Sequence, residues 1–231
     1  MKSALYATAA IIVLAAPLHA ADMASAPTAF DWTGFYIGVD GGYDWAKSEW
    51  HNTAIDGNYF VYDPKGWTLG GHVGVNKQMN SFVLGIEGDL NYGNVENNNG
   101  NFYDSAGVFQ GGYIGKSNVN WQGSGRVRVG LAADRVMPYI TGGIAIADYD
   151  YGWANGGATY SANKMMTGWT AGAGIEFAVN DRLSVRAQYL YADYGAFNHG
   201  AYSDDQGVPG YAPYKVDLTT STATIGMSLH F

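Results

Sequence analysis

The sequence MMTGWTAGAGIEFAVNDRLSVRAQYLYADY, residues 165–194, decides the fold class. In its first half, Trp169 and Phe177 share one side with small or aliphatic residues at every second position. This period of two predicts a β-strand. The pair Asn180-Asp181 then favours a turn, and the alternation resumes over residues 183–191. The stretch is therefore a predicted hairpin with one apolar face.

A strand of a soluble β-sandwich alternates in the same way as a membrane strand, so the residues on the two faces have to distinguish them. The apolar face carries aromatic residues near its ends, as a lipid-facing strand between two interfacial girdles does. The opposite face holds Glu176 and Arg186 among glycines, which suits a narrow polar interior. We therefore interpret the stretch as a hairpin of a membrane β-barrel.

The composition agrees with this interpretation. The chain has 231 residues, 33 glycines, 18 tyrosines and only 14% charged residues, which argues against disorder and against an ordinary soluble enzyme. There is no cysteine, so an exported chain of this kind has to be held together by something other than disulfides, such as a closed sheet. The formal charge of -8 disfavours nucleic acid as a partner.

The first 33 residues do not continue the β pattern. Residues 1–20 combine Lys2, an apolar run and Leu18-His19-Ala20, which predicts a secretory signal peptide. Residues 21–33 are expected to be a periplasmic N-terminal linker, and residues 34–231 the barrel domain.

Eight segments alternate with a period of two, and the connections between them are long and short in turn. The segments are residues 34–45, 67–76, 82–92, 121–131, 137–147, 165–178, 183–194 and 219–231. We expect long loops at 46–66, 93–120, 148–164 and 195–215, and short turns between them. An even strand count with this alternation is typical of an outer-membrane barrel. The predicted fold class is all-β: an eight-stranded, antiparallel, up-and-down transmembrane β-barrel.

Several segments of the sequence resemble those of a known protein family. FDWTGFYIGVDGGY, VLGIEGDLNY, GRVRVG, MPYITGGIA, GWTAGAGIEF and VRAQYLYADYG resemble the small outer-membrane β-barrel family of alpha-proteobacteria, whose members include surface antigens and proteins described as hemin-binding, and which is related in architecture to the OmpA transmembrane domain. The resemblance implies that the alternate residues at the end of the chain are read by the outer-membrane assembly machinery. This assembly signal consists of Phe231, Leu229, Met227 and Ile225.

The inward face of the predicted barrel gathers charged residues of both signs. An eight-stranded barrel is just wide enough to be filled by side chains, and buried charges have to be paired. We therefore expect a salt-bridged plug, with a narrow pore filtered by the same residues as the alternative. The predicted lumen charge cluster comprises Asp40, Asp44, His72, Glu87, Asp89, Arg126, Arg128, Glu176 and Arg186.

Other chemistry finds little support in the sequence. No serine lies in a G-x-S-x-G elbow, so no catalytic residue is assigned. The five histidines are scattered without paired spacing, so no metal site or cofactor is assigned. Hemin would need an exposed axial ligand beside aromatic residues. The candidates are His51 near Trp50, and His199 near Phe197 and Tyr202.

The sequence thus predicts a structural, surface-exposed protein of the outer membrane and not an enzyme. The alternative is a narrow porin or a hemin- or ligand-binding surface protein. The expected partners are outer-membrane lipids, lipopolysaccharide and the assembly machinery. The loops are expected outside the cell and both termini in the periplasm. The sequence leaves the oligomeric state open.

Overall fold

The computed structural model describes residues 29–53, 58–155, 158–199 and 214–231. The expected signal peptide and most of the expected linker lie outside these ranges. Within them, no helix has both the length and the apolar character needed to cross a membrane. The strands are β1 (Gly34–Asn52), β2 (Tyr59–Tyr62), β3 (Lys65–Met79), β4 (Phe82–Tyr103), β5 (Phe109–Leu131), β6 (Val136–Asn155), β7 (Ala158–Ala178), β8 (Leu183–His199) and β9 (Tyr214–His230).

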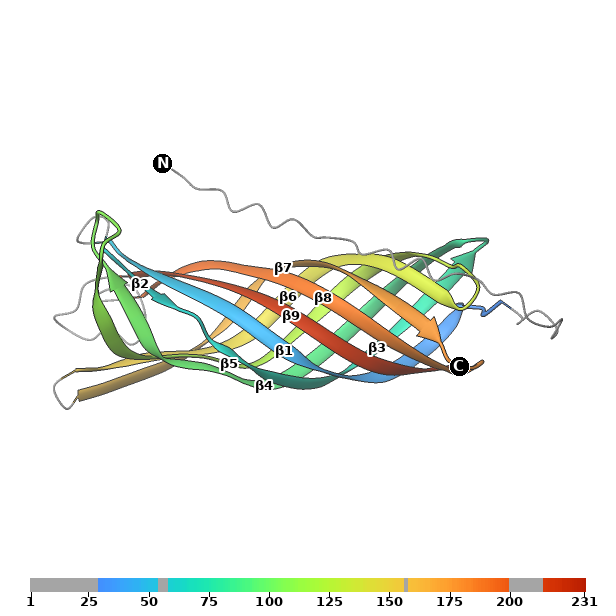
Figure 1. Ribbon diagram of the computed structural model, residues 1–231, viewed down its shortest axis with the longest axis horizontal. Coiled ribbons are helices and arrows are strands. Elements are labelled where there is room, and N and C mark those ends of the chain that lie inside the picture. Colours follow the sequence, from blue (N-terminus) through green and yellow to red (C-terminus); the bar gives the residue numbers. More distant parts are fainter. Residues whose placement is uncertain (1–28, 54–57, 156–157, 200–213) are drawn as a thin grey trace, which may run out of the picture.

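The strands form one closed antiparallel sheet (Figure 1). Each long strand pairs with the next in the chain, and β9 returns to pair with β1 from Tyr36↔His230 to Asn52↔Tyr214. Closure leaves no free edge in the barrel wall. The predicted eight-stranded antiparallel barrel, formed by β1 and β3 to β9, is confirmed.

The ninth strand, β2, was not predicted. It takes over from β3 as the neighbour of β1 toward the arm end of the barrel. The β1–β3 pairing ends at Trp45↔Lys65, and β1 then pairs with β2 from Ser48↔Tyr62 onward. The break falls at Asp63-Pro64, where proline has no N–H to donate to the sheet. Pro64 still accepts a hydrogen bond from Ala46 N at 2.8 Å.

The expectation of long loops at one end of the barrel is largely wrong. The β4–β5 ladder continues to Tyr103↔Phe109, and the β6–β7 ladder runs to Asn155↔Ala158. We call these extended hairpins the arms and this end of the barrel the arm end. The two arms diverge, since β5–β6 pairing stops at Gly115↔Trp153; the divergence is visible at the left of Figure 1.

Short turns close the opposite end, which we call the turn end. They lie at residues 80–81, 132–135 and 179–182. Asn80 and Asp134 have φ angles of 56° and 52°, a left-handed conformation that Asn and Asp tolerate better than most residues. The start of β1 and the C-terminal Phe231 lie at this end (Figure 1).

The outward face carries apolar residues between two aromatic belts. Phe35, Phe82, Phe177 and Phe231 are exposed at the turn end, and Trp45, Trp67, Tyr92, Trp169 and Tyr189 are exposed toward the arms. Aliphatic residues such as Ile86, which is 60% exposed, lie between the belts. This pattern is typical of a lipid-facing barrel surface.

Candidate functional site

The inward face forms three layers along the barrel. A charged layer, which we call the waist, lies between an apolar cluster at the turn end and a larger aromatic cluster toward the arms. Eight of the nine residues of the predicted lumen charge cluster are at most 5% exposed, and the side chain of the ninth, Asp89, is 6% exposed. Eight of them meet in the waist, and Asp44 lies apart.

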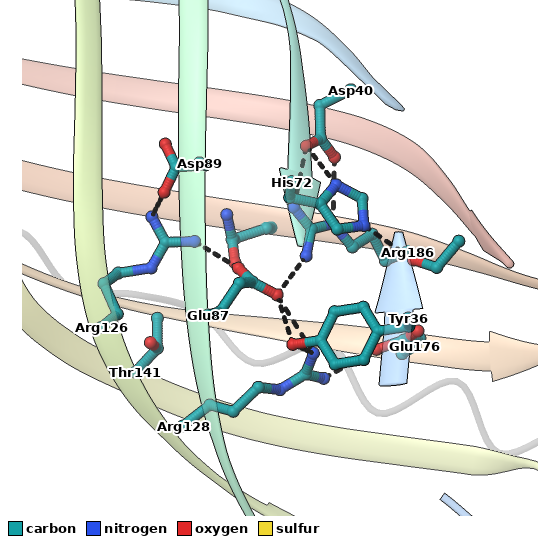
Figure 2. Close-up of polar contacts among 12 residues, drawn as sticks. Tyr36, Asp40, His72, Glu87, Asp89, Arg126, Arg128, Thr141, Glu176 and Arg186 are labelled. Atoms are coloured by element: carbon teal, nitrogen blue, oxygen red, sulfur yellow. Dashed lines mark hydrogen bonds and ion pairs between the residues drawn. The ribbon is translucent and has the colours of Figure 1, made fainter. Parts of the chain in front are cut away.

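Glu87 on β4 stands at the centre of the waist (Figure 2). Its Oε2 accepts hydrogen bonds from Arg186 Nη1 at 2.7 Å, Arg128 Nη1 at 3.2 Å and the Tyr36 hydroxyl at 2.8 Å. Its Oε1 accepts from Arg126 Nη2. One buried carboxylate thus receives three guanidinium groups that come from β5 and β8.

The remaining acids complete the pairing of these arginines. Arg186 donates from Nε and Nη2 to the two oxygens of Asp40, at 2.9 and 2.8 Å. Arg128 Nη2 donates to Glu176 at 2.7 Å, and Arg126 Nη1 donates to Asp89 at 2.5 Å. Continuous ion pairs therefore link β1, β4, β5, β7 and β8 across the lumen (Figure 2).

Glycines make room for the long side chains on neighbouring strands. A Cβ built on Gly38 would lie 2.3 Å from the His72 ring, and one built on Gly226 would lie 2.1 Å from Asp40 Oδ1. In each case the glycine stands beside the charged residue in the sheet register. The high glycine content thus belongs to the packing of the waist.

Asp40, His72 and Ser228 are hydrogen-bonded in series. His72 Nδ1 lies 2.6 Å from Asp40 Oδ2, and His72 Nε2 lies 2.9 Å from Ser228 Oγ. The order is that of a hydrolase triad. However, all three residues are at most 3% exposed, and both oxygens of Asp40 also accept from Arg186. The arrangement is enclosed within the ion-pair network.

Asp44 is buried nearer the arms, where Gln122 Nε2 donates to its Oδ2 at 3.1 Å. Gln122 also lines a cavity of about 30 Å³ that is bounded by waist residues on one side and Tyr194 on the other. A volume of this size holds one or two water molecules. Within the described ranges, no group of three or more His, Cys, Asp or Glu residues is arranged to hold a metal ion.

The cluster toward the arms is aromatic, although residues 46–66 were expected to form a polar loop. Trp50 and Tyr62 are buried with Tyr149, Tyr151 and Leu218. The Tyr149 hydroxyl lies 2.8 Å from Ser48 Oγ and 3.0 Å from Ser117 Oγ. The polar tips are therefore satisfied inside an otherwise apolar layer.

The turn-end cluster includes the last residues of the expected linker. Trp32 is fully buried with Phe30, Met137 and Tyr139. Trp32 N donates to Gln78 Oε1 at 3.0 Å. The expected linker was assigned no packing role, so this contact was missed, although Phe30 and Trp32 stand two residues apart just before β1.

The hemin candidates do not form a shared site. The inward–outward alternation along β1 puts Trp50 and His51 on opposite faces of the sheet. Trp50 is 3% exposed in the lumen, whereas the His51 side chain is 45% exposed and its ring stacks on Tyr59 at 5.5 Å. Phe197 packs against the aromatic cluster. The side chain of His199 and the whole of Tyr202 lie outside what the structure describes.

The predicted cluster leaves out inward polar residues that bond into the waist, among them Tyr36, Ser124, Ser184, Ser228 and His230. Tyr36 and Ser228 bond into the waist as described above, and His230 Nε2 lies 2.9 Å from Ser184 Oγ, which in turn donates to Glu176 at 2.6 Å. The period of two already places these residues inward. Which residues meet across the lumen depends on the stagger of the strands, which the period does not give.

Comparison with known proteins gives a consistent picture. Residues 7–231 match the family model described as outer membrane protein beta-barrel domain. The chain is 32% identical over 209 residues to a 25 kDa outer-membrane immunogenic protein of Brucella abortus, covering 86% of this chain and 87% of that protein. It is 35% identical over 221 residues to a 31 kDa outer-membrane immunogenic protein of Brucella melitensis, covering 86% and 89%.

Among solved structures, the chain is similar to Neisserial surface protein A, with a TM-score of 0.43 and 12% identity, covering 86% of this chain and 98% of that one. It is also similar to the attachment invasion locus protein Ail of Yersinia pestis, with a TM-score of 0.40 and 15% identity, covering 86% and 100%. The family model spans the whole barrel and the Brucella relatives match nearly all of it. The chain therefore belongs to the outer membrane β-barrel protein family.

Proposed function

We propose that this protein is a structural, surface-exposed component of the outer membrane whose lumen is closed to solutes. Its role is to support the integrity of the envelope and to present the arms outside the cell. It performs no catalysis and needs no cofactor. Its partners are outer-membrane lipids, lipopolysaccharide and the assembly machinery.

The observation that carries the closed lumen is the set of ion pairs around Glu87. Two of the guanidinium groups that reach it come from the neighbouring strand β5 and the third from β8 across the lumen, and each also bonds a second carboxylate. Removing one partner of a buried pair leaves an uncompensated charge, which is strongly unfavourable. A path for ions through the waist would have to break several such pairs at once.

Orientation follows from the two ends of the barrel. Outer-membrane barrels have short turns on the periplasmic side and longer extensions outside. The turns at residues 80–81, 132–135 and 179–182 support a periplasmic turn end, and the arms support an outer arm end. The outward, exposed side chains of Ile225, Met227, Leu229 and Phe231 support their role as the assembly signal.

Conductance in planar lipid bilayers tests the closed lumen. The pure, folded protein is expected to give no steady channels. A variant that removes Glu87, Arg126 and Arg128 together, each to alanine, opens a water path through the waist and is expected to conduct. Steady channels from the unaltered protein would contradict the closed lumen and favour the narrow-pore alternative.

Two further experiments test the remaining parts of the proposal. A deletion strain is expected to be more sensitive to detergent than its parent, and unchanged sensitivity would count against the envelope role. A fluorophosphonate probe, which labels activated serines, is expected to leave Ser228 unmodified because that residue is 1% exposed. Labelling that disappears in Ser228→Ala would revive the enzyme hypothesis.

A further inference from the structure

We propose that the outward face of β7, β8, β9, β1 and β3 holds a binding site for lipid A, the phosphorylated glycolipid of the outer leaflet. An acyl chain lies in an apolar groove of this face, and a phosphate is held by Lys47 and Lys65 above it. The inference deepens the proposed lipid partnership and rests on the proposed orientation of the barrel.

The groove arises from an alternation of large and small outward residues in the sheet register. Tyr189 on β8 pairs with Ala173 on β7 and with Ala223 on β9. Ala223 pairs in turn with Tyr43 on β1. The small residues form the floor of the groove, and the aromatic residues form its walls. The groove is lined by Gly41, Tyr43, Trp67, Ala187, Tyr189 and Ala223, among others.

The chemistry of the groove fits a hydrocarbon chain. A Cβ built on Gly41 would meet nothing within 4 Å, so the floor is open to the outside. The groove lies in the apolar band, just on the turn-end side of the aromatic belt at Tyr43 and Trp67. An acyl chain is the occupant that the surrounding bilayer offers at this depth.

Two lysines stand at the arm end of the same groove. Lys65 pairs with Trp45 in the register, directly beyond the Tyr43↔Trp67 pair. Lys47 follows Trp45 by two residues on the same face. The two lysines are diagonal neighbours across β1 and β3, at about 7–8 Å between backbones, and both are exposed. Their flexible side chains can converge on one phosphate.

Acidic residues are also near this pair. Lys47 Nζ lies 2.5 Å from Glu49, and Lys65 faces Glu96 in the β4 register. Asp63 precedes Lys65 in the chain. Glu49 stands two residues farther from the bilayer band than Lys47. An ammonium group has three donors, so each lysine can bond an acidic neighbour and a phosphate oxygen together.

The packing of the belt fixes this end of the groove. The Tyr43 ring contacts Trp45 and Trp67 edge-on, with centroids 5.1 and 5.2 Å apart. Aromatic clusters of this kind sit at headgroup depth. The lysines directly beyond them are therefore at the depth of the lipid A phosphates.

A second outward groove provides an internal comparison. It is lined by Phe35, Val73, Gly88, Gly125, Gly142 and Ile144, among others, and has the same alternation of large and small residues. Toward the arms, its strands β4 and β6 continue to Tyr92 and Asp148 on the outward face. The outward lysine of β5, Lys116, stands five residues beyond Trp121 and is ion-paired with Asp150 at 3.1 Å, so it lies farther from the apolar band than Lys47 and Lys65 do. We assign the phosphorylated lipid to the first groove alone.

Native mass spectrometry of the full mature chain, folded in detergent, tests the site. The probes are bisphosphorylated lipid A, chemically dephosphorylated lipid A, phosphatidylglycerol and phosphatidylethanolamine. One bisphosphorylated lipid A is expected to bind in preference to the other three. The double variant Lys47→Gln/Lys65→Gln is expected to lower that affinity about tenfold, while Lys47→Arg/Lys65→Arg keeps it.

Matched variants separate the site from general lipid contact. Gly41→Phe fills the groove and is expected to weaken binding, with Ala223→Leu as a second filling variant if the first does not fold. The controls are Lys77→Gln, an exposed lysine at the other end of β3, and Gly125→Phe in the second groove. Both controls are expected to bind lipid A normally.

The proposal is overturned if phosphatidylglycerol binds as tightly as lipid A, or if the controls weaken binding as much as the site variants. Heat-dependent mobility on gels reports folding separately. A chain that does not fold as a barrel contradicts the proposed function, whereas a folded barrel without lipid A preference contradicts this inference alone.

Discussion

The waist of the lumen and the aromatic cluster toward the arms fill the same barrel with opposite chemistry. At the waist, three arginines share their partners, and Glu87 bonds all of them. Toward the arms, Trp50, Tyr62 and Tyr149 pack with aliphatic residues, and the polar tips of Trp50 and Tyr149 are hydrogen-bonded to Ser48. A change at one waist residue is therefore expected to destabilise the whole waist. A change in the aromatic cluster toward the arms, which we call the arm layer, is expected to remove only the contribution of the residue that is changed.

The largest effect is expected from Glu87→Gln. The change leaves three buried guanidinium groups short of one negative charge, and breaking a buried pair typically costs about 3–5 kcal/mol. Unfolding by urea in lipid vesicles measures the change in the free energy of unfolding. Glu96→Gln is the control, because Glu96 is an exposed carboxylate on the same strand. Equal effects of the two variants would mean that the waist is not cooperative.

Trp50→Ala is expected to lower stability by about 3 kcal/mol, the usual range for removing a buried large aromatic residue. The loss should be local, since Trp50 lies on the arm side of the waist and contacts Tyr62 and Tyr151. Hydrogen exchange should rise in the arms and stay slow around Glu87. Trp67→Ala, on the outward face, should leave exchange in the arms unchanged, and exchange rising equally through the waist would contradict the comparison.

Tyr149→Phe tests the polar tips of the arm layer. The variant removes one hydroxyl that contacts Ser48 and Ser117 and keeps the ring, so a loss of about 1 kcal/mol is expected. The readout is thermal unfolding in detergent. A loss as large as that of Trp50→Ala would show that the arm layer also depends on a polar network.

The smallest effect is expected at the tip of the β4–β5 arm. Backbone N–H groups of Val108 and Ala106 donate to Asp104 Oδ1 and hold the pKa of this carboxyl below its usual range. Because the folded pKa is lowered, the turn is stabilised fully above about pH 4 and loses this contribution as the pH falls through the folded value. Amide exchange at residues 104–108 measures it, and Asp104→Asn should abolish the pH dependence.

The period of two in the sequence was enough to predict the eight strands of the wall and the inward direction of every waist residue. The pair Asn180-Asp181 marks a turn correctly. The arms were mistaken for loops because outside the apolar band both faces of a strand can be polar, so segments such as 93–120 lose the contrast on which the prediction depends.

The partners within the waist could not be predicted. Glu176 and Arg186 are neighbours in the register, yet each bonds a residue from across the lumen. Those contacts depend on strand stagger and on side-chain length. The burial of Trp32 was missed for a related reason. The residues that surround it come from β4, β6 and β7, which are far from Trp32 in the sequence.

The central claim is that alternate residues of each strand face lipid and a closed interior. Since the chain has no cysteine, single cysteines at positions 169–177 on β7 can each carry a nitroxide label in the bilayer-inserted protein. We predict that collision with oxygen rises and falls with a period of two, high at Trp169, Ala171, Ala173, Ile175 and Phe177, while a water-soluble nickel complex reaches neither face. An oxygen profile without this alternation, or access of the nickel complex to the inward positions, would contradict the account.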